Sequence, residues 1–335
     1  MRIIVTGGCG FIGSTLIKKL ITNKKNLVLN IDSLNKVSMP ESLNKIKINK
    51  NYHFKKTDIR NKKKLLEIIL EFKPNRIFHL AAESHVDRSI TNPDSFLTSN
   101  IIGTYNLLES SKIFLSKNKK FTKNFKIIHV STDEVYGSLN FKERAFKETN
   151  KFLPNSPYSA SKASSDLICR AWFKTYKIPV ITTNCSNNYG PWQFPEKLIP
   201  VVISKILQNK KIPIYGSGKN IRDWIHVEDH TDALIKISNK GKIGETYNIG
   251  DNNEISNLDL VKHICKIFDE IKMRKVPSKK LISFVKDRLG HDFRYSINSK
   301  KIENKLNFRC QIKFSNGLRQ TVNWYLENEK WLIKK

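Results

Sequence analysis

The chain carries near its start a glycine-rich stretch that reads Thr6-Gly7-Gly8-Cys9-Gly10-Phe11-Ile12-Gly13. A short apolar run, residues 2–6, precedes it, and an amphipathic stretch, residues 11–23, follows it. An apolar run, a glycine-rich stretch and an amphipathic stretch in this order predict a buried strand, a tight turn and a helix. The stretch therefore decides how the first unit of the fold begins.

Three glycines of this turn have the spacing of a dinucleotide-binding loop. Gly7, Gly10 and Gly13 would let the backbone approach a pyrophosphate, and the free N–H groups of the helix would bind its oxygens. Asp32 stands 19 residues after Gly13 and ends the second predicted strand. Its carboxylate would accept a hydrogen bond from a ribose 2′-hydroxyl and repel a 2′-phosphate. We therefore expect NAD as the cofactor rather than NADP.

Strand and helix patterns alternate over the first half of the chain. We expect strands at 2–6, 27–31, 52–55, 76–80, 126–131 and 180–184, and helices at 11–23, 62–72, 94–116 and 157–176. Such alternation predicts an α/β fold with a doubly wound parallel sheet of the Rossmann type. After Pro191 short strands (212–215, 224–226, 246–249) mix with helices (196–208, 227–238, 256–271, 315–326). The sequence predicts a cofactor domain with the catalytic residues, 1–190, and a smaller mixed α/β substrate lobe, 191–335, with the chain crossing between them.

Composition excludes several classes of protein. The 335 residues include 39% hydrophobic ones, enough for a sizeable core, and no apolar run is long enough to cross a bilayer. Five scattered cysteines predict neither a disulfide framework nor a metal site, and with the missing signal peptide they favour the cytoplasm. The 60 Lys and Arg against 30 Asp and Glu leave a net charge of +30. Because the lysines are spread along the chain, we interpret them as a solvated surface, and expect neither nucleic acid nor a membrane as a partner.

Two segments hold candidate catalytic groups. Tyr158 and Lys162 are four residues apart and would lie on one face of a helix, where the ammonium should lower the pKa of the phenol. A tyrosinate beside NAD could remove a hydroxyl proton while hydride leaves the same carbon. Asp133 and Glu134 follow the fifth predicted strand, where two acids can be held in different protonation states. That pair suits elimination of water, which an oxidation alone does not need.

These motifs together resemble a known family over essentially the whole chain. The strings are TGGCGFIGS (6–14), HLAAESHVDRSI (79–90), STDEVYG (131–137), PYSASKA (157–163), NCSNNYGP (184–191), KLIP (197–200) and DRLGHDFRY (287–295). They are similar to the extended short-chain dehydrogenase/reductases, and among them to the dTDP-glucose 4,6-dehydratases. The resemblance implies a lyase of nucleotide-sugar metabolism that makes dTDP-4-keto-6-deoxyglucose with tightly bound NAD, in dTDP-rhamnose or deoxysugar biosynthesis. It also implies a homodimer through the helices at 94–116 and 157–176.

The resemblance also implies a role for each catalytic residue. Tyr158 would take the proton of the glucose 4-hydroxyl, with Thr132 bonded to the same oxygen. Glu134 would remove the C5 proton, and Asp133 would protonate the departing C6 hydroxyl. Hydride would return to C6, and Lys162 would lower the pKa of Tyr158 and bind the nicotinamide ribose.

Binding residues are implied in the same way. For the cofactor they are Gly7, Gly10, Phe11, Ile12, Gly13, Asp32, Ser33, Leu34, Asn35, Asp58, Ile59, Leu80, Ala81, Ala82, Ser84, Thr98, Tyr158, Lys162 and Asn188. For the sugar nucleotide they are Ser84, Thr132, Asn187, Lys197, Leu198, Tyr215, Arg222, Asn257, Arg288 and His291. Arg222 and Arg288 are the candidates for the diphosphate, because a guanidinium donates in a rigid fork.

Some alternatives stay open at this point. The chain departs from the family pattern at residues 35–38, at Leu289 and at Phe293, and the nucleotide base is not encoded in the motifs. A UDP- or CDP-glucose 4,6-dehydratase and a nucleotide-sugar C4-epimerase are alternatives within the same fold. A basic nucleic-acid-binding protein that kept a dinucleotide fold, and an inactive scaffold, are alternatives of other classes.

Overall fold

A seven-stranded parallel sheet forms the centre of the larger part of the molecule. The computed structural model describes residues 1–121 and 123–335. The strands run in the order β10-β6-β5-β4-β1-β2-β3, and every neighbouring pair is parallel. Their bounds are β1 Arg2–Thr6, β2 Leu27–Asp32, β3 Tyr52–Lys56, β4 Arg76–His79, β5 Lys126–Thr132, β6 Val180–Cys185 and β10 Thr246–Ile249. The predicted doubly wound parallel fold is therefore confirmed.

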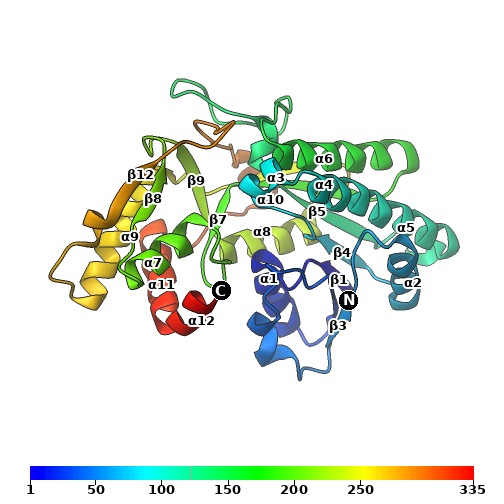
Figure 1. Cartoon of the computed structure of the whole chain (residues 1–335). Helices are drawn as coiled ribbons and strands as arrows, with labels where there is room; N and C mark the ends of the chain where they lie inside the picture. Colours follow the sequence, from blue (N-terminus) through cyan, green and yellow to red (C-terminus); the bar gives the residue numbers. More distant parts are fainter. Residues whose placement is uncertain (122) are drawn as a thin grey trace.

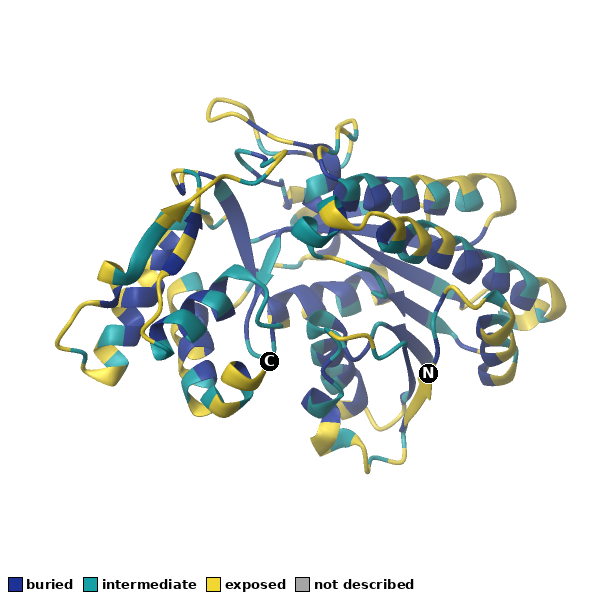
Figure 2. Cartoon of the chain, in the orientation of Figure 1, coloured by how far each residue is buried: buried dark blue, intermediate teal, exposed yellow. Residues whose placement is uncertain are grey.

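Helices cover both faces of this sheet (Figure 1). One face packs on α1 (Phe11–Thr22), α8 (Val227–Lys240) and α10 (Lys300–Leu306), the other on α2 (Lys62–Phe72), α5 (Gly103–Lys117) and α6 (Pro157–Tyr176). Ile3 and Val5 of β1 belong to the first core, and Ile4 between them belongs to the second. This alternation is what a strand buried on both faces requires, and Figure 2 shows the strands as the most buried elements. Within the described residues no helix is long and apolar enough to span a membrane.

A second lobe carries its own core. It contains α7 (Leu198–Leu207), α9 (Asn257–Lys272), α11 (Phe314–Glu327) and α12 (Glu329–Lys334). Two small sheets join it, β11-β9-β7 and β12-β8, with bounds β7 Asn187–Tyr189, β8 Ile212–Tyr215, β9 Ile221–His226, β11 Glu254–Ser256 and β12 Ile282–Val285. The strand predicted at 246–249 lies elsewhere: it is β10, which pairs with β6 and completes the large sheet. The chain thus crosses back from the second lobe into the first part of the fold.

The secondary structure differs from the expected elements in a segment that lines the cavity described below. The helix expected over 94–116 forms as α4 (Asp94–Phe96), a π-helical segment η2 (Leu97–Ile102) and then α5. A π turn is wider than an α turn, so it changes which side chains face inward. The short elements α3 (Val86–Thr91), η1 (Pro40–Ile46), η3 (Lys119–Phe121), η4 (Asp133–Tyr136) and η5 (Ser278–Leu281) were not expected.

Candidate active site

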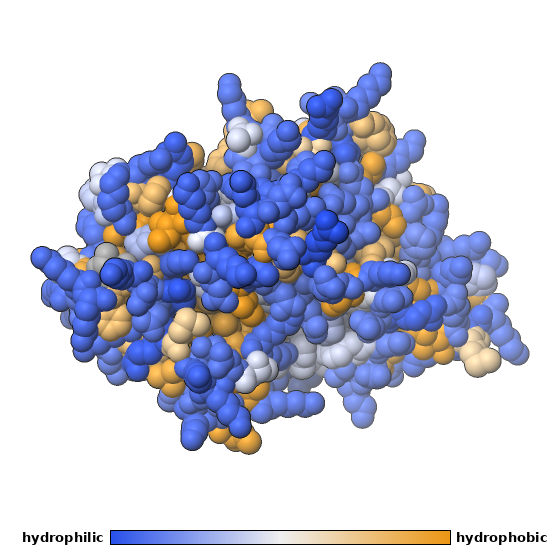
Figure 3. Space-filling view, turned by 180° about the vertical axis from the view of Figure 1, so that it is seen from behind, coloured by the Kyte–Doolittle hydropathy of each residue, from blue (hydrophilic) through white to orange (hydrophobic). Residues whose placement is uncertain are grey.

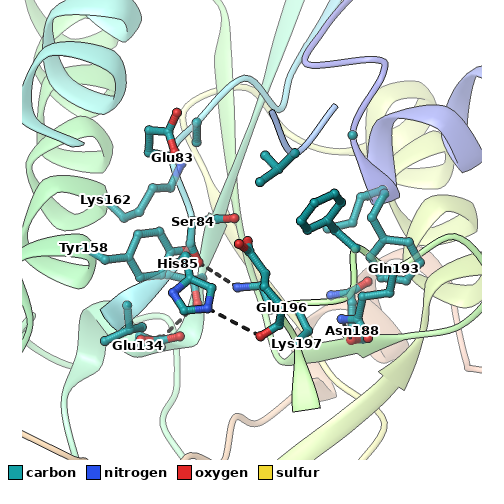
Figure 4. A pocket seen from close by; sticks show the side chains of 18 of the residues that line it. Glu83, Ser84, His85, Glu134, Tyr158, Lys162, Asn188, Gln193, Glu196 and Lys197 are labelled. Carbon is teal, nitrogen blue, oxygen red and sulfur yellow. Dashed lines mark hydrogen bonds between the residues drawn. The ribbon is translucent and has the colours of Figure 1, made fainter. Parts of the chain in front are cut away.

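A cavity of about 560 Å³ opens at the carboxyl ends of the parallel strands, between the sheet and the second lobe. Ligands of doubly wound sheets bind at this edge. In Figure 4, Tyr158 and Lys162 reach into the cavity from α6, while Asn188 and Gln193 lie on the opposite side. The predicted cofactor and substrate residues line this one cavity, with two exceptions described below.

The glycine turn lies where β1 passes into α1. Gly7 has a φ of +71°, and a Cβ added there would meet the Ala81 amide nitrogen at 2.7 Å. A Cβ added at Gly13 would lie 2.2 Å from the Gly7 carbonyl oxygen. The helix that follows has no side-chain cap at Gly10 and no acid in its first turn. Its terminal N–H groups and the bare backbone therefore suit a pyrophosphate.

Asp32 ends β2 with its carboxylate already positioned. Its Oδ2 accepts from the Cys9 amide at 2.9 Å, and its Oδ1 accepts from the Leu34 amide and the Ser38 hydroxyl at 2.8 Å each. The carboxylate is buried and keeps lone pairs toward the cavity that it lines. Ser38 stands in the segment that departs from the family pattern, yet it helps to orient Asp32. Together with the glycine turn, these residues fit NAD.

Two predicted cofactor residues do not line the cavity. Leu34 has a φ of 57°, and its side chain packs against the core. Thr98 is exposed and donates its hydroxyl to the Asp94 carbonyl oxygen at 2.8 Å, while its neighbour Ser99 lines the cavity. Thr98 lies in the π-helical segment, whose wider turn brings Ser99 inward instead. Other lining residues belong to no motif and were not expected: Val37, Ser38, Met39, Thr57 and Ser99.

Asp133 is a buried acid that lacks a full set of partners. It follows β5 and is 2% exposed. Thr132 donates its hydroxyl to Asp133 Oδ1 at 3.2 Å, and among the described residues Oδ2 has no hydrogen-bond partner. Burial, the Glu134 carboxylate and the Asp223 carboxylate raise the pKa of Asp133 well above its ordinary value. Such a carboxyl keeps its proton and can donate it.

Glu134 has a different electrostatic environment. Burial raises its pKa, but the cations Arg222 and Lys197 act in the opposite direction. Figure 4 shows its carboxylate beside the ring of Tyr158. The pKa values of both acids are raised, that of Asp133 well above its ordinary value, while the two cations partly offset the effect of burial at Glu134.

Tyr158 corrects one expectation. Burial, Glu134 and Cys185 raise the pKa of its phenol well above the ordinary value, and the hydrogen bond of Thr132 acts in the opposite direction. The net shift is therefore opposite to the lowering that was expected from Lys162. The ammonium of Lys162 instead donates to the Val130 carbonyl oxygen at 2.8 Å, and burial lowers its own pKa. A weakened, backbone-bound ammonium offers little stabilisation to a phenolate.

All ten predicted substrate residues line the cavity, but the two arginines already have partners. Arg222 donates from Nη2 to the Asp292 carbonyl oxygen at 2.9 Å and from Nη1 to the Phe293 carbonyl oxygen at 3.3 Å. It therefore anchors residues 287–293, which we call the substrate loop. Arg288 of this loop pairs with Asp87, Nε to Oδ1 at 2.5 Å. Neither Asp87 nor Asp292 was expected to take part.

Lys197 links the two halves of the cavity. Its ammonium donates to the Ser84 carbonyl oxygen at 2.8 Å, across from the loop that follows β4 (Figure 4). The neighbouring Glu196 accepts from Arg88 at 3.2 Å, and its carbonyl oxygen contacts His85 at 3.4 Å. His85 and Glu196 also line the cavity and were not expected to, although His85 stands inside a quoted motif.

Comparison with known proteins agrees with this geometry. The model of the GDP-mannose 4,6 dehydratase family matches residues 4–321. A dTDP-glucose 4,6-dehydratase of Shigella flexneri is 48% identical, over 99% of this chain and 94% of that protein. The structure of a dTDP-glucose 4,6-dehydratase from Bacillus anthracis in complex with NAD is 42% identical, with a TM-score of 0.87 over 99% of this chain and 98% of that one. One from Streptomyces venezuelae with NAD bound is 38% identical, with a TM-score of 0.90 and the same coverage.

The chain is thus similar to these proteins over nearly its full length. In addition, the acid pair, the tyrosine and the glycine turn line a single cavity. A simple oxidoreductase of this fold has no use for the acid pair. The chain therefore belongs to the dTDP-glucose 4,6-dehydratase family.

Proposed function

We propose that this protein converts dTDP-glucose to dTDP-4-keto-6-deoxyglucose with NAD as a resident cofactor. One observation carries the proposal: Asp133 and Glu134 line the same cavity as Tyr158 and the glycine turn. An epimerase needs the tyrosine and the cofactor but no acid that can protonate a leaving hydroxyl. A dehydratase needs all of them.

The residues divide the proton transfers among themselves. Tyr158 takes the proton of the 4-hydroxyl, and Thr132 holds the same oxygen. The 4-keto group then acidifies C5, from which Glu134 removes a proton, while Asp133 gives its proton to the C6 hydroxyl and water leaves. The resulting C5–C6 double bond is reduced by return of hydride to C6 and of a proton to C5, which gives the 4-keto-6-deoxy sugar. NAD, when bound, supplies the acceptor and later the donor of hydride, together with a positive ring that favours the anion of Tyr158. Lys162 and Asp32 hold its two riboses.

The test is a substrate comparison. The purified protein is incubated with dTDP-glucose, UDP-glucose and CDP-glucose, and the 4-keto-6-deoxy product is measured by mass spectrometry and NMR. We expect the product from dTDP-glucose, formed faster than from the other two. A nucleotide-galactose product with no loss of water would identify an epimerase instead, and faster turnover of UDP- or CDP-glucose would reassign the base.

We also propose a homodimer through α5 and α6. Large apolar side chains are exposed on and beside these helices: Ile102 at 49%, Leu167 at 56% and Tyr176 at 48%. A second copy would cover them, as a paired four-helix interface does. Leu167→Glu should yield monomers in size-exclusion chromatography with light scattering, whereas an unchanged elution of this variant would exclude the interface.

The remaining proposals concern organisation and location. Residues 1–190 form the cofactor domain with the catalytic residues, and 191–335 mainly the sugar-nucleotide lobe; the return of β10 to the large sheet supports a crossing chain. The cytoplasm is the proposed location, supported by five free thiols in the structure. Cell fractionation with an antibody against the chain tests it.

A further inference from the structure

One edge of the large sheet gathers the lysines that the sequence spreads apart. Because all seven strands are parallel, they all begin at the same edge, which lies opposite the cavity. The chain starts at this edge, at the N label in Figure 1. Six connections lead from a helix into a strand there: residues 23–26, 47–51, 73–75, 118–125, 177–179 and 241–245. We call this surface the amino edge.

The amino edge is strongly positive. Its six connections hold ten lysines and a single acid, Glu245. The lysines are Lys24, Lys25, Lys47, Lys50, Lys73, Lys119, Lys120, Lys123, Lys177 and Lys242, and all ten are exposed. Among the described residues only Lys242 forms an ion pair, with Glu245 at 3.8 Å. The other nine ammonium groups have no ion-pair partner in the described part of the chain, so this edge attracts polyanions.

Stabilisation of helix ends explains the positions of some of these lysines but not of the others. Lysines near the carboxyl end of a helix interact favourably with its dipole, and Lys73 and Lys177 directly follow α2 and α6. The effect is confined to the last turn. Lys119, Lys120 and Lys123 come after α5 has ended at Lys117, so the dipole does not account for them.

An apolar side chain projects from the same surface. Ile48 is 94% exposed and stands between Lys47 and Lys50. Transfer of an exposed isoleucine from water into an apolar phase is favourable, and the flanking lysines would draw this side chain toward anionic headgroups. A nucleic-acid backbone offers no such phase, and recognition of nucleic acid favours the fork of arginine, which these connections lack.

We propose that the amino edge docks on an anionic lipid bilayer, with the lysines at the headgroups and Ile48 inserted between them. The cavity lies at the other end of every strand and stays open to solvent. This proposal revises the expectation that no membrane takes part. That expectation rested on lysines dispersed in sequence, and the parallel topology brings ten of them to one surface.

A second basic segment serves as the matched control. Residues 273–280, after α9, hold Arg274, Lys275, Lys279 and Lys280 beside Met273, which is 88% exposed. This segment belongs to a single connection in the other lobe, whereas the amino edge is built from six. A planar bilayer is contacted better by the broad surface, since each lysine near the membrane adds to binding.

The experiment measures co-sedimentation of the full chain with vesicles of phosphatidylcholine, with or without phosphatidylglycerol, at about 0.05 M and about 0.5 M NaCl. We expect binding to the anionic vesicles alone, lost at high salt. The triple change Lys119→Gln, Lys120→Gln and Lys123→Gln should weaken the partition about a hundredfold. Ile48→Ser should weaken it about tenfold. Turnover of dTDP-glucose should be unchanged in both variants, which shows that they are folded.

The control variant combines Lys275→Gln, Lys279→Gln and Lys280→Gln, with the same change in charge. It should bind as the unchanged protein does. The proposal is overturned if the unchanged protein does not bind anionic vesicles, if the control variant loses binding as the amino-edge variant does, or if single-stranded RNA displaces the vesicles at equal charge concentration. None of these results depends on the sugar substrate, so the proposed function is tested separately.

Discussion

Asp133→Asn should separate the two halves of the proposed reaction. The change keeps the shape of the side chain, and asparagine Oδ1 can still accept from the Thr132 hydroxyl that now lies 3.2 Å from Asp133 Oδ1. What is lost is an acidic proton in a buried place. Oxidation at C4 depends on Tyr158 and takes no proton from Asp133, so removing that acid does not hinder the first step.

The expected magnitude comes from the surroundings of the acid. General acid catalysis contributes about 10²- to 10⁴-fold. Asp133 is 2% exposed, which leaves little room for a water molecule to replace its proton. We therefore expect elimination of water to slow by about a thousandfold and oxidation at C4 by less than about tenfold.

Single-turnover kinetics measure both steps. The near-ultraviolet absorbance of reduced cofactor reports oxidation, and quenched samples analysed by mass spectrometry report loss of water. The variant should accumulate the oxidised sugar with reduced cofactor. Glu134→Gln is the matched control, and it should in addition stop exchange of the C5 proton with solvent. If Asp133→Asn slowed both steps equally, the assignment of Asp133 as the acid would be wrong.

Three further predictions concern the glycine turn, a buried histidine and an arginine. Gly13→Ala places a Cβ 2.2 Å from the Gly7 carbonyl oxygen and should weaken NAD binding about a hundredfold by calorimetry, whereas Gly10→Ala, whose Cβ lies 3.2 Å from that oxygen, should lose less. Burial lowers the pKa of His230 to about 3, below that of the unfolded chain, so its contribution to stability is present above ~6.5 and is lost as the pH falls. Between neutral pH and pH ~5, His230 should lower the free energy of unfolding in urea by about 2 kcal/mol. Burial also lowers the pKa of His79 and His129, so the His230→Gln variant should still lose stability, but by about 2 kcal/mol less than the unchanged protein. Arg222→Lys removes the forked donation to the substrate loop and should raise KM about tenfold with kcat nearly unchanged; a loss confined to kcat would contradict an anchoring role.

Much of the fold was predictable because its signals are local. The helix expected at 62–72 has the bounds of α2, and the helix expected at 157–176 has those of α6. Apolar runs flanked by turns mark the parallel strands for the same reason. The residues that line the cavity were also predictable where they belong to motifs, since the carboxyl ends of neighbouring parallel strands meet at one edge.

What escaped prediction depends on residues that are distant in sequence. The balance at Tyr158 sums burial with charges from two other elements, and no spacing along one helix encodes it. The π turn at Leu97–Ile102 exchanges Thr98 for Ser99 without any local signal. The partners of Arg222 come from a loop about seventy residues away. Even the charge of the amino edge was visible only after six connections had been placed side by side.

The bare Oδ2 of Asp133 has a consequence for the durability of the protein. A buried acceptor without a partner costs about 1–3 kcal/mol, and an apolar replacement of similar shape would recover it. Selection for heat tolerance alone would thus favour variants that have exchanged this acid, while the sheet remained intact. Variants selected by melting temperature alone would become more stable and lose activity at the same time. Turnover therefore has to be measured in the same screen.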